Sequence, residues 1–184
     1  TNNPPANSLT SVTWTDTLNN LWLYHKFGDL WKYTMLTNEW TWMKGSGVAG
    51  QTPIYGVQGI PASANTPGSN IENKAAWTDS LNNLWLYNKG NMWKYSILTN
   101  EWTWMKGNGS ANVVDFGTQG VPGPTVQPEQ EDSYIQWQDR NDNFYIATNG
   151  LPGTSSTVWM YHMDLNQWEW HSGDSALNSG TQDG

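Results

Sequence analysis

The chain has 184 residues, with 16 acidic and 8 basic side chains, a net charge of −8 and no cysteine. Because nucleic acids and anionic membranes attract positive surfaces, this charge argues against either as the main partner. The lack of cysteine excludes disulfides, thiolate metal sites and cysteine nucleophiles. No apolar run approaches the roughly 18 residues that would suggest a membrane span, so no membrane insertion is expected.

The first predicted strands follow a linker-like start. Residues 1–9 contain paired prolines, which disfavour helix. A short strand is expected over residues 10–14, and the Asp- and Asn-rich residues 15–20 predict a hairpin turn. Leu21–Tyr24 is apolar at every position, which predicts a strand buried on both faces.

Two further strands complete a unit. Residues 25–29 predict a reversal and residues 30–33 a third strand. In Glu39–Lys44 the period of two places Trp40 and Trp42 on one face. The four strands predict an antiparallel meander whose apolar centre needs neighbours on both faces, as in a stack of sheets.

The unit occurs three times. LTNEWTWMKG occupies residues 36–45 and returns at 98–107, and LNQWEWHSG at 165–173 is a third copy. Five aromatic positions per copy account for all 14 tryptophans, with Tyr145 the single replacement, so these residues are expected to form the structural core. The positions are Trp14, Trp22, Trp31, Trp40, Trp42, Trp77, Trp85, Trp93, Trp102, Trp104, Trp137, Tyr145, Trp159, Trp168 and Trp170.

The repeats divide the chain into an N-terminal linker with a first unit (1–45), a linker with a second unit (46–107), a linker with a third unit (108–173) and a C-terminal linker (174–184). Residues 55–61 and 116–122 share an aromatic-Gly-x-Gln-Gly-aliphatic-Pro pattern. This recurrence predicts that the long linkers are ordered and packed between units. No helix is predicted.

The unit contains an apolar W-L-Y/F strand, then L-W-K-Y, then T-N-x-W-x-W. This order of motifs resembles the kelch repeat, in particular the long-linker variety of the galactose oxidase central domain. The resemblance covers essentially the whole chain. It implies an all-β fold of three kelch-like four-stranded antiparallel blades, forming part of, or assembling into, a β-propeller or blade stack. The adjacent glycines usual after the second kelch strand are replaced by His25-Lys26, Asn88-Lys89 and Thr148-Asn149.

Propellers close with about four to eight blades, so three repeats leave alternatives open. Copies of the chain could close or assemble with one another, the chain could belong to a longer propeller, or the blades could form an open stack. The chain has no initiator Met or signal peptide and both its ends resemble linkers, so we expect a processed form or an excised piece. Its wealth of Asn, Ser, Thr and Gly favours a secreted or cell-surface location.

The resemblance would imply a copper oxidase site with His and Tyr ligands and a cysteine-modified tyrosine, but the chain has no cysteine. His25, His162 and His171 fall at non-equivalent places in the repeat, and His171 replaces a methionine. We therefore assign no catalytic residue, metal ligand or cofactor.

Three further motifs in the sequence are less specific. Residues 139–143 match the start of a calcium loop but align with the other hairpin turns, which favours a turn. The acidic residues 129–132 indicate a solvated face. Asn108 begins an Asn-Gly-Ser glycosylation sequon.

The leading hypothesis is a non-enzymatic structural or interaction module that assembles with itself or binds a protein through blade faces and loops. The alternative is a lectin-like glycan binder, with Trp42, Trp104 and Trp170 as the tryptophans best placed to stack on a sugar. A fragment of a secreted carbohydrate-active oxidase is the third hypothesis.

Overall fold

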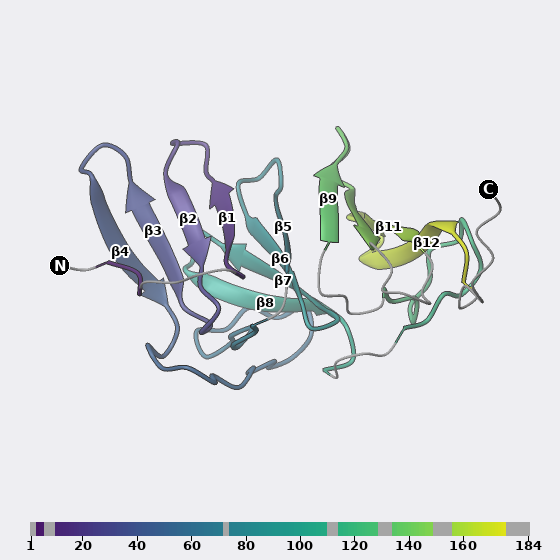
Figure 1. The fold of residues 1–184 in the computed structure, drawn as a ribbon, viewed down its shortest axis with the longest axis horizontal. Helices are drawn as coiled ribbons and strands as arrows, with labels where there is room; N and C mark the ends of the chain where they lie inside the picture. Colours follow the sequence, from purple (N-terminus) through teal and green to yellow (C-terminus); the bar gives the residue numbers. More distant parts are fainter. Residues whose placement is uncertain are drawn as a thin grey trace, which may run out of the picture.

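The computed structural model describes residues 3–5, 10–71, 74–109, 114–128, 134–148 and 156–175. The protein is all-β: its described residues form three four-stranded antiparallel sheets and no helix (Figure 1). In the same residues there is accordingly no helix long and apolar enough to cross a bilayer. The predicted all-β class and four-stranded meander are confirmed in all three repeats.

Each sheet takes its strands in chain order. The first contains β1 (Val12–Thr15), β2 (Leu21–Tyr24), β3 (Leu30–Thr34) and β4 (Glu39–Lys44). The second contains β5 (Ala75–Thr78), β6 (Leu84–Asn88), β7 (Asn91–Ser96) and β8 (Glu101–Lys106). The third contains β9 (Tyr134–Gln138), β10 (Phe144–Thr148), β11 (Thr157–His162) and β12 (Gln167–Gly173).

The first turn of each sheet is built around an aspartate. Between β1 and β2, Asp16 Oδ1 accepts hydrogen bonds from the backbone N–H groups of Leu18 and Asn20, both at 2.9 Å. Its Oδ2 accepts one from the Trp22 indole at 2.9 Å. Asn19 adopts a left-handed backbone with φ of 59°, which asparagine tolerates better than most residues. The sequence therefore closes this hairpin through local bonds.

The three sheets pack side by side, with their first strands adjacent: β1 contacts β5, and β5 contacts β9 (Figure 1). The middle sheet is covered on both sides, and β6 is buried along its whole length. Two apolar clusters result, one between the first and second sheets and one between the second and third. The hydrophobic core therefore consists of two inter-sheet layers.

The described parts of both long linkers pack against the sheets, as the recurring pattern predicted, and each contacts the following sheet. Tyr55 lies over Trp93 and Trp104, with ring centroids 5.3 and 4.9 Å away. Gly59 N–H donates to the Trp104 carbonyl at 2.8 Å. The other end of the same linker reaches back to the first sheet, where the Tyr24 hydroxyl donates to the Gly68 carbonyl at 2.7 Å.

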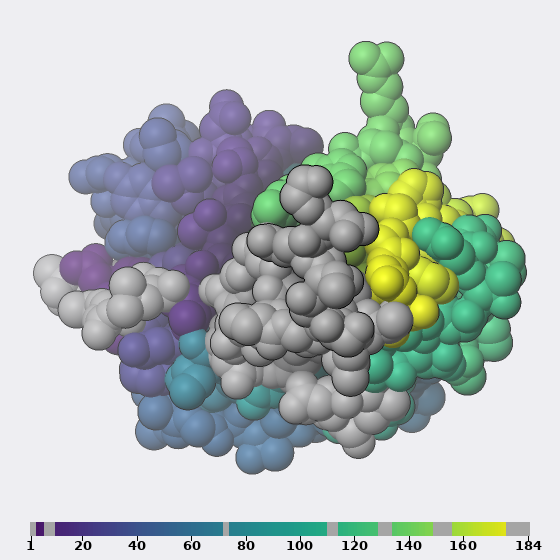
Figure 2. All heavy atoms as spheres, turned by 45° about the vertical axis from the view of Figure 1, so that its right-hand side comes forward, coloured from purple at the N-terminus to yellow at the C-terminus, as the bar shows by residue number. Residues whose placement is uncertain are grey.

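The second linker repeats this arrangement on the third sheet. Phe116 lies 5.1 Å from Trp159 and 5.2 Å from Trp170. Gly120 N–H donates to the Trp170 carbonyl at 2.9 Å. In the space-filling view the teal residues 114–128 lie directly beside yellow β12 (Figure 2). The recurring aromatic of the linker signature is thus a packing residue.

One expectation about the strands is wrong for the first sheet. Leu21–Tyr24 was expected to be buried on both faces, but Leu21 is 42% exposed. The equivalent Leu84 in the second sheet is 0% exposed. The difference arises because no sheet lies behind the first one. The acidic residues 129–132, predicted to form a solvated face, lie outside the described residues. So do residues 149–155, most of residues 1–9 and residues 176–184.

Candidate functional site

Each sheet has a front face, directed toward the next sheet along the chain, and a back face, directed toward the preceding one. The two inter-sheet layers each join a front face to a back face. The first layer includes Trp14, Trp22 and Tyr24 in front and Leu86, Trp93 and Trp102 behind. The second includes Trp77, Trp85 and Tyr87 in front and Ile146, Trp159 and Trp168 behind. No described sheet covers the back face of the first sheet or the front face of the third.

The open back face of the first sheet is aromatic. The register pairs Leu21 with Tyr33 and Tyr33 with Trp40, so these three side chains share a face. A parallel row on the same face joins Leu23, Trp31 and Trp42. Trp42 is 46% exposed, and the Trp31 indole N–H is buried without an acceptor among the described residues. This face therefore presents apolar surface, with an unsatisfied donor buried beneath it.

The open front face of the third sheet carries a row formed by Trp137, Tyr145, Met160 and Glu169, which are paired across the four strands. Trp137 is 41% exposed. Its ring stacks on that of Tyr145, with centroids 5.2 Å apart and planes 9° from parallel. The aromatic half of this face is thus accessible at one edge of the molecule.

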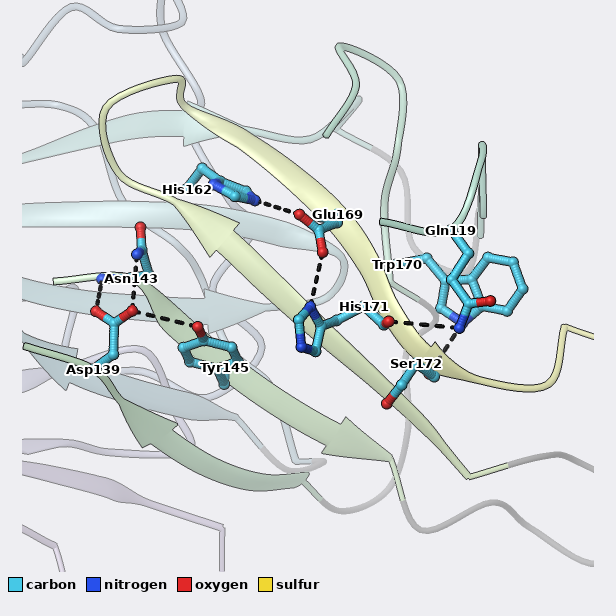
Figure 3. A network of polar contacts seen from close by, with 9 residues as sticks. All are labelled: Gln119, Asp139, Asn143, Tyr145, His162, Glu169, Trp170, His171 and Ser172. Atoms are coloured by element: carbon cyan, nitrogen blue, oxygen red, sulfur yellow. Dashed lines mark hydrogen bonds and ion pairs between the residues drawn. The ribbon is translucent and has the colours of Figure 1, made fainter. Parts of the chain in front are cut away.

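Tyr145 keeps the hydrogen bond of the tryptophan that it replaces. Its hydroxyl donates to Asp139 Oδ2 at 3.3 Å (Figure 3), as the Trp85 indole donates to Asp79 at 2.7 Å. Burial raises the pKa of Asp139, but hydrogen bonds from Asn143 and other donors outweigh it, so this pKa lies below its ordinary value. Residues 139–143 form the hairpin turn that the alignment favoured over a calcium loop.

At the other end of the row two histidines meet one carboxylate. His162 Nε2 lies 2.7 Å from Glu169 Oε2, and His171 Nδ1 lies 2.8 Å from Glu169 Oε1 (Figure 3). Burial raises the pKa of Glu169, whereas the hydrogen bonds from His171 and His162 lower it. The hydrogen bonds have the larger effect together, so the pKa lies below its ordinary value. Glu169 is 6% exposed. The polar end of the open face is therefore internally paired.

The sequence interpretation placed these histidines at unrelated repeat positions and did not single out Glu169. A signal was present, because Glu169 stands where the first two repeats have Thr41 and Thr103. His25 lies apart from the pair: it is fully buried, with its ring 4.7 Å from Phe27.

Most positions of the aromatic template are buried, including Trp31 on the open back face of the first sheet. Nine positions are buried, namely Trp14, Trp22, Trp31, Trp77, Trp85, Trp93, Trp102, Trp159 and Trp168, and four are half-buried, namely Trp40, Trp104, Tyr145 and Trp170. Trp42 and Trp137 contradict the expectation of a buried core, because both lie on the open faces. Of the three tryptophans considered for sugar stacking, only Trp42 is exposed.

The remaining features considered are a surface hollow and the glycosylation sequon. A shallow hollow between the two linkers is lined by Gln58, Lys106, Asp115 and Gln127, among others. Across the described segments, no three His, Cys, Asp or Glu side chains gather as a metal-binding group. Asn108 is exposed beside the hollow, and Ser110 of its sequon lies outside the described residues.

Comparison with protein-family models gives no match for this chain, and comparison with curated proteins gives none either.

Proposed function

We propose that this chain is a non-catalytic, kelch-type interaction module that binds protein partners through the two open sheet faces. The repeat motifs and the meander order of every sheet support the kelch assignment. The proposed setting is the cell surface or the extracellular medium, with no cofactor.

A single observation carries the proposal: equivalent side chains are covered inside the molecule and uncovered at its ends. Leu84 and Leu21 occupy the same repeat position, yet their exposed fractions are 0% and 42%. Fully burying a leucine side chain is worth about 1.5 to 3 kcal/mol. Covering an open face therefore lowers the free energy, and contiguous apolar patches of this kind mark interaction sites.

Fluorescence of the dye 1-anilinonaphthalene-8-sulfonate, measured on dilute protein, tests whether the open faces bind apolar ligands. We expect the wild-type chain to enhance the dye signal and the double variant Trp42→Arg/Trp137→Arg to lose most of that enhancement. Leu98→Arg is the matched control, since Leu98 is 94% exposed in a turn of the middle sheet. Equal dye signals from the double variant and a wild type that is monomeric at the same concentration would refute the proposal.

A second function is favoured by the exposed Trp137, whose ring stacks on that of the half-buried Tyr145. A flat aromatic surface of this kind can carry a sugar ring. Titration with soluble cello-, chito- and galacto-oligosaccharides, followed by tryptophan fluorescence, tests this alternative. A lectin-like protein would respond to at least one of them and lose that response in Trp137→Ala, whereas a protein-binding module would show no response.

A further inference from the structure

The two junctions inside the molecule are the same junction formed twice. At the first, the rings of Trp22 and Tyr95 lie 5.6 Å apart. At the second, the equivalent rings of Trp85 and Tyr161 lie 5.8 Å apart. A second ring pair also recurs: Tyr24 with Trp102 at 5.7 Å, then Tyr87 with Trp168 at 5.3 Å. A front face therefore recognises a back face by a repeated set of contacts.

A polar contact at the rim follows the same rule. Thr17 N–H donates to the Asn82 side chain of the next sheet at 3.0 Å. Ser80 N–H donates in the same way to the Asp142 carboxylate at 2.9 Å. The equivalent donor on the third sheet is Arg140 N–H, and the equivalent acceptor on the first sheet is the side chain of Asn19. Each open face thus retains one half of this contact.

The repeat equivalence also predicts which side chains of the two open faces would meet. By the repeat equivalence, Tyr145 of the third sheet would meet Tyr33 of a first sheet, and Trp40 would lie over the small side chain of Ala147. Each carboxylate oxygen of Glu169 already has a histidine nitrogen within hydrogen-bond distance, so covering this side chain leaves neither oxygen without a partner. The front face of the third sheet can therefore be buried without an orphaned carboxylate.

We propose that the partner of each open face is the other open face on a second copy of this chain, so that two copies join head to tail into a ring of six blades. Six lies within the range of about four to eight blades at which propellers close. Two identical junctions related by a twofold axis satisfy every open face, in the commonest oligomer symmetry. This inference rests on the proposed function, because it requires that the open faces bind protein.

Sedimentation equilibrium over a wide concentration range tests the proposal. We expect the mass to rise from 20.7 kDa to twice that value and then to remain constant. A mass that stays at the single-chain value would overturn the inference. Growth beyond the dimer would overturn the closed ring.

Single-face variants distinguish a head-to-tail pair from a symmetric pairing of like faces. Trp42→Arg on the back face and Trp137→Arg on the front face should each abolish the dimer, whereas Leu98→Arg should leave it intact. An equimolar mixture of Trp42→Arg and Trp137→Arg should regain a 1:1 dimer, because one junction in that pair has two wild-type faces. A dimer that survives in either single variant, or a mixture that stays monomeric, would contradict head-to-tail pairing.

Two controls complete the experiment. Urea unfolding of each variant checks that its sheets still fold, and Trp42→Ala and Trp137→Ala replace any arginine variant that does not. The dye assay separates the two hypotheses: a monomeric wild type that binds the dye through Trp42 and Trp137 retains the proposed function but has another partner. A wild type that neither binds the dye nor forms a dimer would refute both the proposed function and the head-to-tail dimer.

Discussion

The aspartate of the first turn should contribute most to stability where its partner is buried. In the middle sheet, Asp79 accepts hydrogen bonds from the backbone of Leu81 and Asn83 and from the Trp85 indole, at 2.7 to 3.0 Å. Trp85 is only 3% exposed, so water cannot replace the carboxylate after Asp79→Ala. The indole N–H would then remain buried without an acceptor.

The cost follows from these contacts. Losing hydrogen bonds to a charged group costs about 1.5 to 3 kcal/mol, and a buried donor left unsatisfied adds about 1 to 3 kcal/mol. We therefore expect Asp79→Ala to lower the free energy of unfolding by about 3 to 5 kcal/mol, a large part of the roughly 5 to 15 kcal/mol of a typical domain. Urea unfolding followed by tryptophan fluorescence, at one fixed protein concentration, measures the change.

Asp139→Ala is the matched control, because it removes the same turn aspartate from the third sheet. There the partner is the half-buried Tyr145 hydroxyl at 3.3 Å, which water can reach, so only the lost bonds to the charged group count and a loss of about 1.5 to 3 kcal/mol is expected. A double-mutant cycle with Trp85→Phe should show coupling of about 1 to 3 kcal/mol with Asp79→Ala. Equal losses for Asp79→Ala and Asp139→Ala, or no coupling to Trp85, would refute the reasoning.

Three further outcomes are expected, each measured by the free energy of urea unfolding. Leu84→Ala should cost about 2 to 5 kcal/mol, whereas Leu21→Ala at the same repeat position should cost less than about 1 kcal/mol; equal costs would show that the two faces are equally covered. Gly107→Ala should destabilise the fold by more than about 1 kcal/mol, because φ is +116° there and an added Cβ would lie 2.3 Å from Asn91 Oδ1. Ser63→Ala, at an exposed position, provides the reference free energy of unfolding for the leucine variants and for Gly107→Ala. The pKa of Glu169 lies below its ordinary value of 4.5 in the folded protein. The ionised Glu169 therefore adds to the free energy of unfolding above pH 4.5, and this stabilisation is lost as the pH falls through the folded-state pKa. Glu169→Gln should flatten this acid dependence, and an unchanged pH profile would contradict the assignment.

Local sequence determined the strands and turns. The period of two in Glu39–Lys44 and the Asp-Asn turns act between residues close in the chain, so the four-stranded unit could be predicted without knowledge of its neighbours. The repeated spacing of tryptophan likewise predicted three equivalent units. The meeting of His162 and His171 at Glu169 could not be predicted in this way, because the strand register and a bulge in β12 bring them together.

The repeated segment LWLY shows which property only the tertiary structure decided, namely the burial of its side chains. LWLY at Leu21–Tyr24 and at residues 84–87 forms the same strand in two sheets. In the second sheet all four residues are buried, whereas in the first Leu21 is exposed. Burial depends on which sheet packs against a face, and that contact joins residues far apart in the chain, as the hydrogen bond between Trp14 and Trp85 joins residues 71 positions apart. The sequence therefore determined the four-stranded sheets, and their packing decided which faces remain uncovered.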